Sequence, residues 1–278
     1  MYDKGVVDSI TKNYLLFSPD NMPRTQQMYF LKKIHKSPTA VRPICSGCGG
    51  ATEKISKLVD HYLQPFVPKI ESHIKDSGHL IHLIENTTLP IDCTIGTIDV
   101  KAMYTNIPHG EGIKAIKNRL YTQNHDLEVP IPPGAMSDLL NTVLTKNYFQ
   151  FVDQMYHQVQ GTAMGTRMAP SYANLFMADL EEKLLAGYHT KPILWKRYID
   201  DILIVWPGDQ DSLRDFVRYL NNAHPTIKFT YECSNTSVDF LDLTLYKGVR
   251  FNRIKKLDIK PFFKHTNKFQ YLMKQASN

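Results

Sequence analysis

Hydrophobic residues recur along this chain with helical periodicity in some segments and with strand-like runs in others. Apolar residues three and four apart predict a helix within residues 51–74, which Pro65 and Pro68 should interrupt. The same spacing predicts further helices over residues 111–120, 136–147, 170–185 and 210–221. Aliphatic, β-branched and aromatic runs predict strands within residues 29–44, 95–100, 148–159, 195–206, 227–231 and 238–246. Hairpins interspersed with helices favour an α+β fold, an antiparallel sheet flanked by helices.

One strand-like run carries two adjacent carboxylates. The stretch KRYIDDILIVW, residues 196–206, places Asp200 and Asp201 inside a segment that should be buried. A buried carboxylate costs several kcal/mol unless it is paired or binds a metal. Because neighbouring residues of a strand point to opposite faces, we expect the chain to reverse at this pair, with the two aspartates at a hairpin tip.

A third carboxylate ends another apolar run. Asp99 follows the short segment IGTI, which predicts a strand over residues 95–100. An isolated aspartate is usually a turn residue or a helix cap. Two strand-end aspartate sites can instead hold two divalent ions roughly 3.5–4 Å apart, which is the arrangement used in phosphoryl transfer. The pattern therefore favours a carboxylate site for Mg²⁺, with Mn²⁺ as a second possible ion.

Composition and charge add a polyanionic partner to this picture. The 278 residues are 42% hydrophobic and 22% charged, which is typical of a globular chain with a sizeable core. The formal net charge is +6, and basic residues concentrate in the segments 29–44 and 247–268. The basic residues of the second region are Lys247, Arg250, Arg253, Lys255, Lys256, Lys260, Lys264 and Lys268.

The cysteines and the apolar segments exclude several classes of protein. Four cysteines are too few for a disulfide framework in a chain of this length. Cys45 and Cys48 have the spacing of half a zinc site, and a glycine-rich turn is the alternative. No apolar run approaches the roughly 18 residues of a membrane span, and the first residues lack a signal peptide pattern. We expect an intracellular protein, nuclear or cytoplasmic, with no membrane partner.

Three blocks of sequence resemble the reverse transcriptases. The sequence YIDD, residues 198–201, resembles their Y-x-D-D motif, and TIDVKAMYTNIP, residues 97–108, resembles their first catalytic aspartate motif. The segment 161–177, GTAMGTRMAPSYANLFM, resembles the loop and helix between these motifs. The amino-acid sequences of these blocks are most similar to those of Penelope-like retroelements, as are KIHK at 33–36 and HPTIKF at 224–229. The resemblance runs from about Tyr29 to the C-terminal segment in the same order.

The resemblance implies roles for individual residues. Asp99 and Asp200 would be the ligands of two metal ions, Asp201 would support them, and the Val100 carbonyl would complete one metal shell. Tyr104 would be the aromatic side chain that excludes a ribose 2′-hydroxyl, with an ordinary core tyrosine as the alternative.

Other residues would contact the nucleotide. Gly161 and Gly165 would let the loop approach the incoming nucleotide and the template closely. Arg42, Lys33 and Lys36 would bind the triphosphate from a basic hairpin, because the planar fork of arginine matches phosphate oxygens. A solvated basic hairpin is the alternative for these three residues.

The match to the family is looser elsewhere. Lys228 is a distant possibility for the general acid that protonates pyrophosphate. Residues 238–246 resemble the hairpin that holds the primer end, and Lys32 stands where the family usually has proline.

The resemblance also implies a domain organisation, a right-hand polymerase with a palm and a fingers subdomain. Residues 1–28 would be a lead-in, 29–94 the fingers, 95–246 the palm with part of 109–160 in the fingers, and 247–278 a basic tail that starts a truncated thumb. The thumb would then be largely absent, with no endonuclease in the sequence, and a partner chain that supplies the thumb is the alternative way to complete the duplex-binding surface.

The implied function is that of an RNA-directed DNA polymerase. It would transfer nucleotides from dNTPs to a DNA primer 3′-hydroxyl along an RNA template, using two Mg²⁺ ions. The alternative is a truncated, inactive retroelement remnant that only binds nucleic acid. Retention of Asp99, Asp200 and Asp201 favours the first hypothesis.

Overall fold

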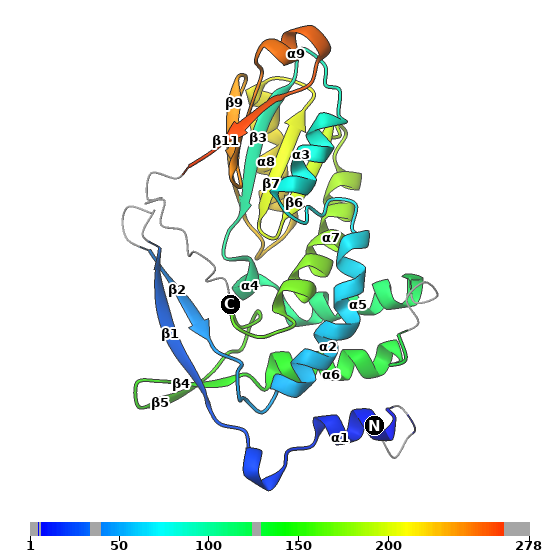
Figure 1. Ribbon diagram of the computed structural model, residues 1–278, viewed down its shortest axis with the longest axis vertical. Helices are drawn as coiled ribbons and strands as arrows, with labels where there is room; N and C mark the ends of the chain where they lie inside the picture. Colours follow the sequence, from blue (N-terminus) through cyan, green and yellow to red (C-terminus); the bar gives the residue numbers. More distant parts are fainter. Residues whose placement is uncertain (1–4, 6, 34–39, 124–128, 264–278) are drawn as a thin grey trace, which may run out of the picture.

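A four-stranded antiparallel sheet, the central sheet, lies in the upper half of the view in Figure 1. The computed structural model describes residues 5, 7–33, 40–123 and 129–263. The central sheet has the order β6-β7-β3-β8, with every neighbouring pair antiparallel. Its strands are β3 (Thr94–Val100), β6 (Leu194–Tyr198), β7 (Asp201–Trp206) and β8 (Phe229–Ser234).

The two faces of this sheet bury different side chains. Alternation along the strands points Ile98, Ile202 and Ile204 to one face, where they join the larger core together with α7 and α8. Ile95 and Leu203 point to the other face and pack with Leu80, Ile84 and other side chains of a second core. Figure 1 shows the central strands between α3 in front and α8 behind. Burial on both faces explains the continuous apolar run of β7.

Most helices match the sequence periodicity. The predicted helices are confirmed as α2 (Glu53–Leu63), α5 (His109–Gln123), α6 (Pro133–Thr145), α7 (Ala169–Gly187) and α8 (Gln210–Ala223). The interruption expected from the two prolines is a 3₁₀ segment, η3 (Gln64–Lys69). The remaining helical elements are α1 (Ser9–Leu15), η2 (Pro19–Asn21), α3 (Ser77–Glu85), α4 (Met103–Asn106) and α9 (Val249–Ile254). Among the described residues, no helix combines the length and the apolar character that a membrane crossing requires.

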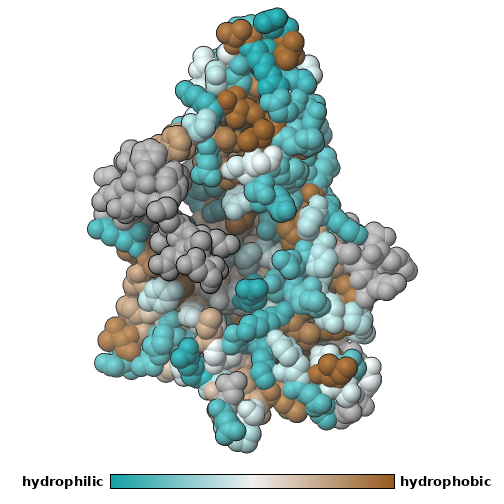
Figure 2. All heavy atoms as spheres, in the orientation of Figure 1, coloured by the Kyte–Doolittle hydropathy of each residue, from teal (hydrophilic) through white to brown (hydrophobic). Residues whose placement is uncertain are grey.

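A second sheet joins two hairpins that are far apart in the sequence. It has the order β2-β1-β4-β5, built from β1 (Gln26–Lys33), β2 (Ala40–Cys45), β4 (Tyr148–Phe151) and β5 (Gln154–His157). Both hairpins were predicted and are confirmed, whereas their union through a parallel β1–β4 pairing was not predicted. Exposed apolar and aromatic side chains gather on this sheet, and Figure 2 shows hydrophobic residues at the end of the β4–β5 hairpin.

A third, three-stranded sheet packs beside the central one. Its order is β11-β10-β9, with β9 (Ser237–Phe240), β10 (Leu243–Tyr246) and β11 (Asp258–Pro261). The segment 238–246 is two short strands, not one: the chain turns at Leu241, whose φ is 55°, and β9 and β10 form the hairpin that the sequence resemblance implied.

The described part of the basic segment after residue 247 folds back on the body of the protein. β11 pairs with β10, and Arg250 forms a salt bridge with Glu85 of α3. Lys256 Nζ donates to the Glu85 carbonyl at 2.7 Å. Several of its positive charges therefore serve contacts within the chain.

Candidate active site

A two-residue turn carries the first aspartate of the YIDD sequence. Tyr198 of β6 pairs with Asp201 of β7, so Ile199 and Asp200 form the connection between the strands. The predicted hairpin is confirmed, with Asp200 in its turn and Asp201 as the first residue of β7. Ile199 has a φ of 58°, which is unusual for a β-branched residue and costs roughly 1–3 kcal/mol. Such strain persists where surrounding contacts fix the chain, and it clusters at functional sites.

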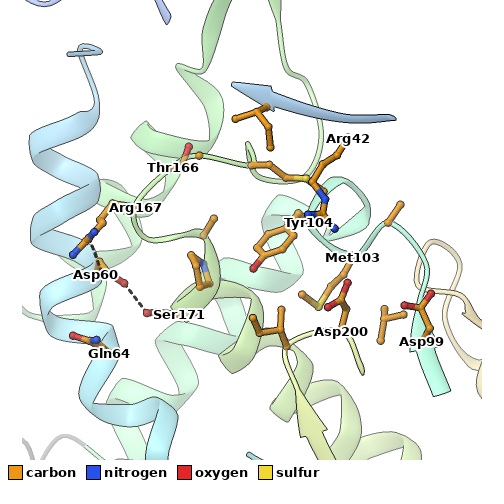
Figure 3. Close-up of a pocket in the computed structure, with 18 residues that line it drawn as sticks. Arg42, Asp60, Gln64, Asp99, Met103, Tyr104, Thr166, Arg167, Ser171 and Asp200 are labelled. Carbon is orange, nitrogen blue, oxygen red and sulfur yellow. Dashed lines mark hydrogen bonds and ion pairs between the residues drawn. The ribbon is translucent and has the colours of Figure 1, made fainter. Parts of the chain in front are cut away.

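Asp99 approaches this turn from the neighbouring strand. It is opposite Asp201 in the β3–β7 ladder, and the Val100 amide donates to the Asp200 carbonyl at 2.9 Å. Asp99, Val100 and Asp200 line one cavity of about 690 Å³. Figure 3 shows the carboxylates of Asp99 and Asp200 on the same side of this cavity. Asp99 and Asp200 therefore line one cavity from neighbouring parts of the sheet. Their joint role as metal ligands stays a prediction.

Asp201 contributes to a different cavity. It lines a separate hollow of about 520 Å³, together with Asp76, Thr97 and Asp239. Thr97 and Asp201 lie on the sheet face that packs against the third sheet, and both line this hollow.

Tyr104 projects into the cavity beside Arg42 (Figure 3). The backbone of Ala102 has a φ of 47°, and this left-handed residue turns the chain from β3 into the short helix α4. Burial raises the pKa of Tyr104 to about 12, with the negative charge of Asp200 acting in the same direction and Arg42 opposing it. The hydroxyl is therefore neutral, and the side chain is half-buried rather than part of the closed core.

Arg42 is the member of the predicted basic trio that the structure places in the cavity. It lies on β2 opposite Leu31, on a hairpin that reaches over the site. Lys33 ends β1, but its side chain lies outside the described residues. Lys36 also lies outside the described residues.

The two loop glycines lie close to backbone on either side. Gly161 has a φ of 70°, and a Cβ there would lie 2.5 Å from the Thr105 Cα. Gly165 has a φ of 118°, and its Cβ would lie 2.4 Å from the Cys45 carbonyl oxygen. The loop is thus clamped between α4 and β2, and the Cys45 amide donates to the Met164 carbonyl at 2.9 Å. Gly161 thus packs against the backbone of α4 and Gly165 against the end of β2, and Gly165 also lines the cavity.

The far wall of the cavity contains residues that sequence reasoning missed. Asp60 and Gln64 come from α2 and the turn after it, and Arg167 and Ser171 from the loop and the start of α7. The Ser171 hydroxyl donates to Asp60 at 2.6 Å, and Arg167 Nε lies 3.6 Å from Asp60 (Figure 3). The only sequence signal was the spacing of Asp60 and Gln64, one helical turn apart.

The structure also places Lys228, considered above as a general acid, and the Cys45 and Cys48 pair. Lys228 Nζ donates to the carbonyls of Asn221 and His224, at 2.5 and 2.8 Å, so its ammonium caps the end of α8. Cys45 is buried whereas Cys48 is exposed.

The oxygen ligands in the cavity fit magnesium. Mg²⁺ is usually held by one or two carboxylates, waters and substrate phosphates. Asp99 and Asp200 supply two carboxylates to one cavity, and Val100, the residue after Asp99, lines the same cavity. Across the described ranges, no three His, Cys, Asp or Glu side chains cluster as a preformed metal cage. A site with two carboxylates is suited to an ion that arrives with phosphate ligands.

Comparisons with solved structures support a polymerase fold. Telomerase from Candida tropicalis in complex with a TWJ fragment of telomeric RNA superposes with a TM-score of 0.61, at 14% identity, over 100% of this chain and 50% of that chain. Telomerase from Candida albicans has a TM-score of 0.62 at 11% identity, over 94% of this chain and 48% of the other. The RNA-dependent RNA polymerase of a human picobirnavirus has a TM-score of 0.57 at 10% identity, with coverages of 84% and 46%.

These likenesses establish an α+β polymerase-like fold, and this chain spans about half the length of the structures. Among curated proteins, none has a matching sequence. The family model described as reverse transcriptase (RNA-dependent DNA polymerase) matches residues 34–231, which is more than half of the chain. The chain therefore belongs to the reverse transcriptase family.

Proposed function

We propose that this chain is the polymerase core of a Penelope-like retroelement reverse transcriptase, which extends a DNA primer along an RNA template. The observation that carries the proposal is the convergence of Asp99 and Asp200, from β3 and the β6–β7 turn, on one cavity. Membership of the reverse transcriptase family supports the reaction class. The amino-acid sequences of the blocks at 97–108, 161–177 and 198–201 support the Penelope-like assignment.

The residues of the cavity suit the parts of nucleotide transfer. Asp99 and Asp200, with the Val100 carbonyl, would hold two Mg²⁺ ions, which supply charge neutralisation for the transferring phosphoryl group. Arg42 binds the triphosphate through its planar guanidinium. Tyr104, beside Arg42, closes the space below the sugar and disfavours a 2′-hydroxyl. The protein's contribution is mainly positioning and fixed charge.

The flanking elements suit template and primer. The sheet β2-β1-β4-β5 carries exposed aromatic side chains next to basic ones, including Tyr29, Phe30 and Tyr148 beside Lys32 and Arg42. Aromatic faces stack on bases, and cations bind the backbone of single strands. We assign residues 29–94 to the fingers and 95–246 to the palm, with part of 109–160 in the fingers, and the β9–β10 hairpin to primer binding.

Primer extension tests the proposal. The wild-type chain and an Asp200→Ala, Asp201→Ala variant are incubated with a DNA primer on an RNA template, dNTPs and Mg²⁺. Fluorescence anisotropy of the labelled duplex shows that both proteins bind it. We expect extension by the wild type only. Equal incorporation by both proteins contradicts the assignment, and binding without any extension by the wild type supports the non-catalytic alternative.

A further inference from the structure

A fully buried arginine lies two residues before the strained turn. Arg197 of β6 is 0% exposed and faces α7 in the larger core. Arginine stays ionised in proteins, so burying it carries a large desolvation cost unless every donor is matched. The polymerase chemistry assigned above does not use this residue, because it does not line the cavity.

The surroundings of Arg197 match all five of its donors. Nε donates to Glu181 Oε1 at 2.7 Å, and Nη2 donates to Glu181 Oε2 at 3.4 Å and to the Asn174 carbonyl at 3.1 Å. Nη1 donates to Asn174 Oδ1 at 2.6 Å and to the carbonyl of Ile199 at 3.1 Å. A guanidinium has five N–H groups in a fixed fork, so its position is determined from several directions at once.

The bond to Ile199 reaches the turn itself. Ile199 is the residue with φ 58°, and its carbonyl belongs to the peptide that leads into Asp200. The next carbonyl, that of Asp200, accepts from the Val100 amide at 2.9 Å. The turn is thus held from two sides, by the core through Arg197 and by β3 through Val100. These contacts oppose relaxation of the strained residue.

Glu181 ties this arginine to the rest of the core. Glu181 is 3% exposed, and its carboxylate also accepts from Trp195 Nε1 at 3.0 Å and from the Ser72 hydroxyl at 2.6 Å. The Arg197 amide donates to the Ser72 carbonyl at 2.6 Å. Helix α7, strand β6 and the segment around Ser72 therefore fix the guanidinium.

We propose that Arg197 is a positioning residue, which sets the place of the Asp200 carboxylate through the Ile199 carbonyl. This inference rests on the proposed function of the site. A merely structural ion pair would stabilise the fold, and activity would then follow stability. A positioning role separates the two, because misplacing a reacting group by about 1 Å costs about a hundredfold in rate.

Two variants separate these possibilities. Arg197→Lys keeps the positive charge opposite Glu181, but a single ammonium cannot span Glu181, Asn174 and Ile199. Glu181→Gln weakens the ion pair and keeps the whole guanidinium fork. The measurements are the melting temperature, kcat and KM for a dNTP at a temperature where both variants are folded, and the hydrogen exchange rate of the Val100 amide.

We expect Arg197→Lys to lower kcat about tenfold or more with KM changed less than about threefold, and to speed Val100 exchange about tenfold. Glu181→Gln should lower the melting temperature and leave kcat and Val100 exchange within about threefold of the wild type. Losses of kcat that follow melting temperature in both variants overturn the proposal. If the wild type does not extend primers, the proposed function fails, and Val100 exchange still decides the positioning role: unchanged exchange in Arg197→Lys overturns it.

Discussion

Asp99 of β3 lies directly opposite Asp201 of β7, yet the two residues line different cavities. Asp99 shares its cavity with Asp200, the turn residue next in sequence to Asp201. The geometry thus divides the adjacent pair of the YIDD sequence into one residue at the proposed site and one beside it.

This division predicts unequal effects of two matched substitutions. Asp200→Asn should lower kcat for nucleotide incorporation by a factor of about 10³ or more, because it removes a carboxylate at the reacting phosphate. Asp201→Asn should cost about tenfold to a hundredfold less, since Asp201 acts from the neighbouring cavity. Steady-state incorporation assays compare the two variants, and an equal loss in both would contradict the division.

Tyr104 predicts sugar selectivity. Replacing it with alanine opens the space below the sugar, and ribonucleotide incorporation should rise about tenfold relative to dNTP incorporation. Tyr104→Phe is the matched control, because it keeps the ring that fills this space and should keep the selectivity. The ratio of kcat/KM for rNTP and dNTP measures the effect. An unchanged ratio in Tyr104→Ala means that Tyr104 is only a packing residue.

The loop glycines predict a stability difference that does not depend on activity. Gly161→Ala and Gly165→Ala each place a Cβ against backbone at a positive φ, so each should destabilise the fold by about 2 kcal/mol or more. Gly110→Ala and Gly134→Ala are the controls, because these helical glycines have open space around the added Cβ and should be neutral or stabilising. Denaturant unfolding checks all four; equal effects in both pairs would show that the clamp around the loop is not rigid.

The cysteine pair predicts selective alkylation. Burial raises the pKa of the Cys45 thiol to about 11, so only about one molecule in a thousand is the reactive thiolate at pH 8. Since the thiolate fraction grows as pH rises toward this pKa, Cys45 labelling should stay slow until strongly alkaline pH. Iodoacetamide at pH 8 should therefore modify exposed Cys48 first, as peptide mass spectrometry would show. If Cys45 of a Cys48→Ser protein were alkylated as fast as Cys48 of the wild type, the buried environment of Cys45 would be refuted.

The sequence predicted what local patterns encode. The pattern of apolar residues within segments such as β3, β7 and α7 reflects which of their faces are buried, so it predicted these elements. The aspartates at the strand ends predicted the carboxylate site in the same local way. The parallel pairing of β1 with β4 and the return of β11 to β10 join distant segments, so no local pattern marks them.

Buried charges were the harder part of the site to predict. Arg197 and Glu181 look like surface residues in the sequence, because most charged side chains are exposed. Their burial is meaningful only once β6 and α7 are seen to face each other and all five guanidinium donors are matched. Asp60, likewise, looks like a solvated helix residue until the loop at Arg167 is placed against it.

The central claim is that Asp99 and Asp200 act together in one site, and a double-mutant comparison tests it most directly. Single-nucleotide incorporation on an RNA template is measured for the wild type, Asp99→Asn, Asp200→Asn and the double variant. Groups that act as a unit are strongly non-additive, so the double variant should be no more than about tenfold slower than either single variant. Retention of near-wild-type incorporation by Asp99→Asn, or losses that multiply in the double variant, would contradict the claim.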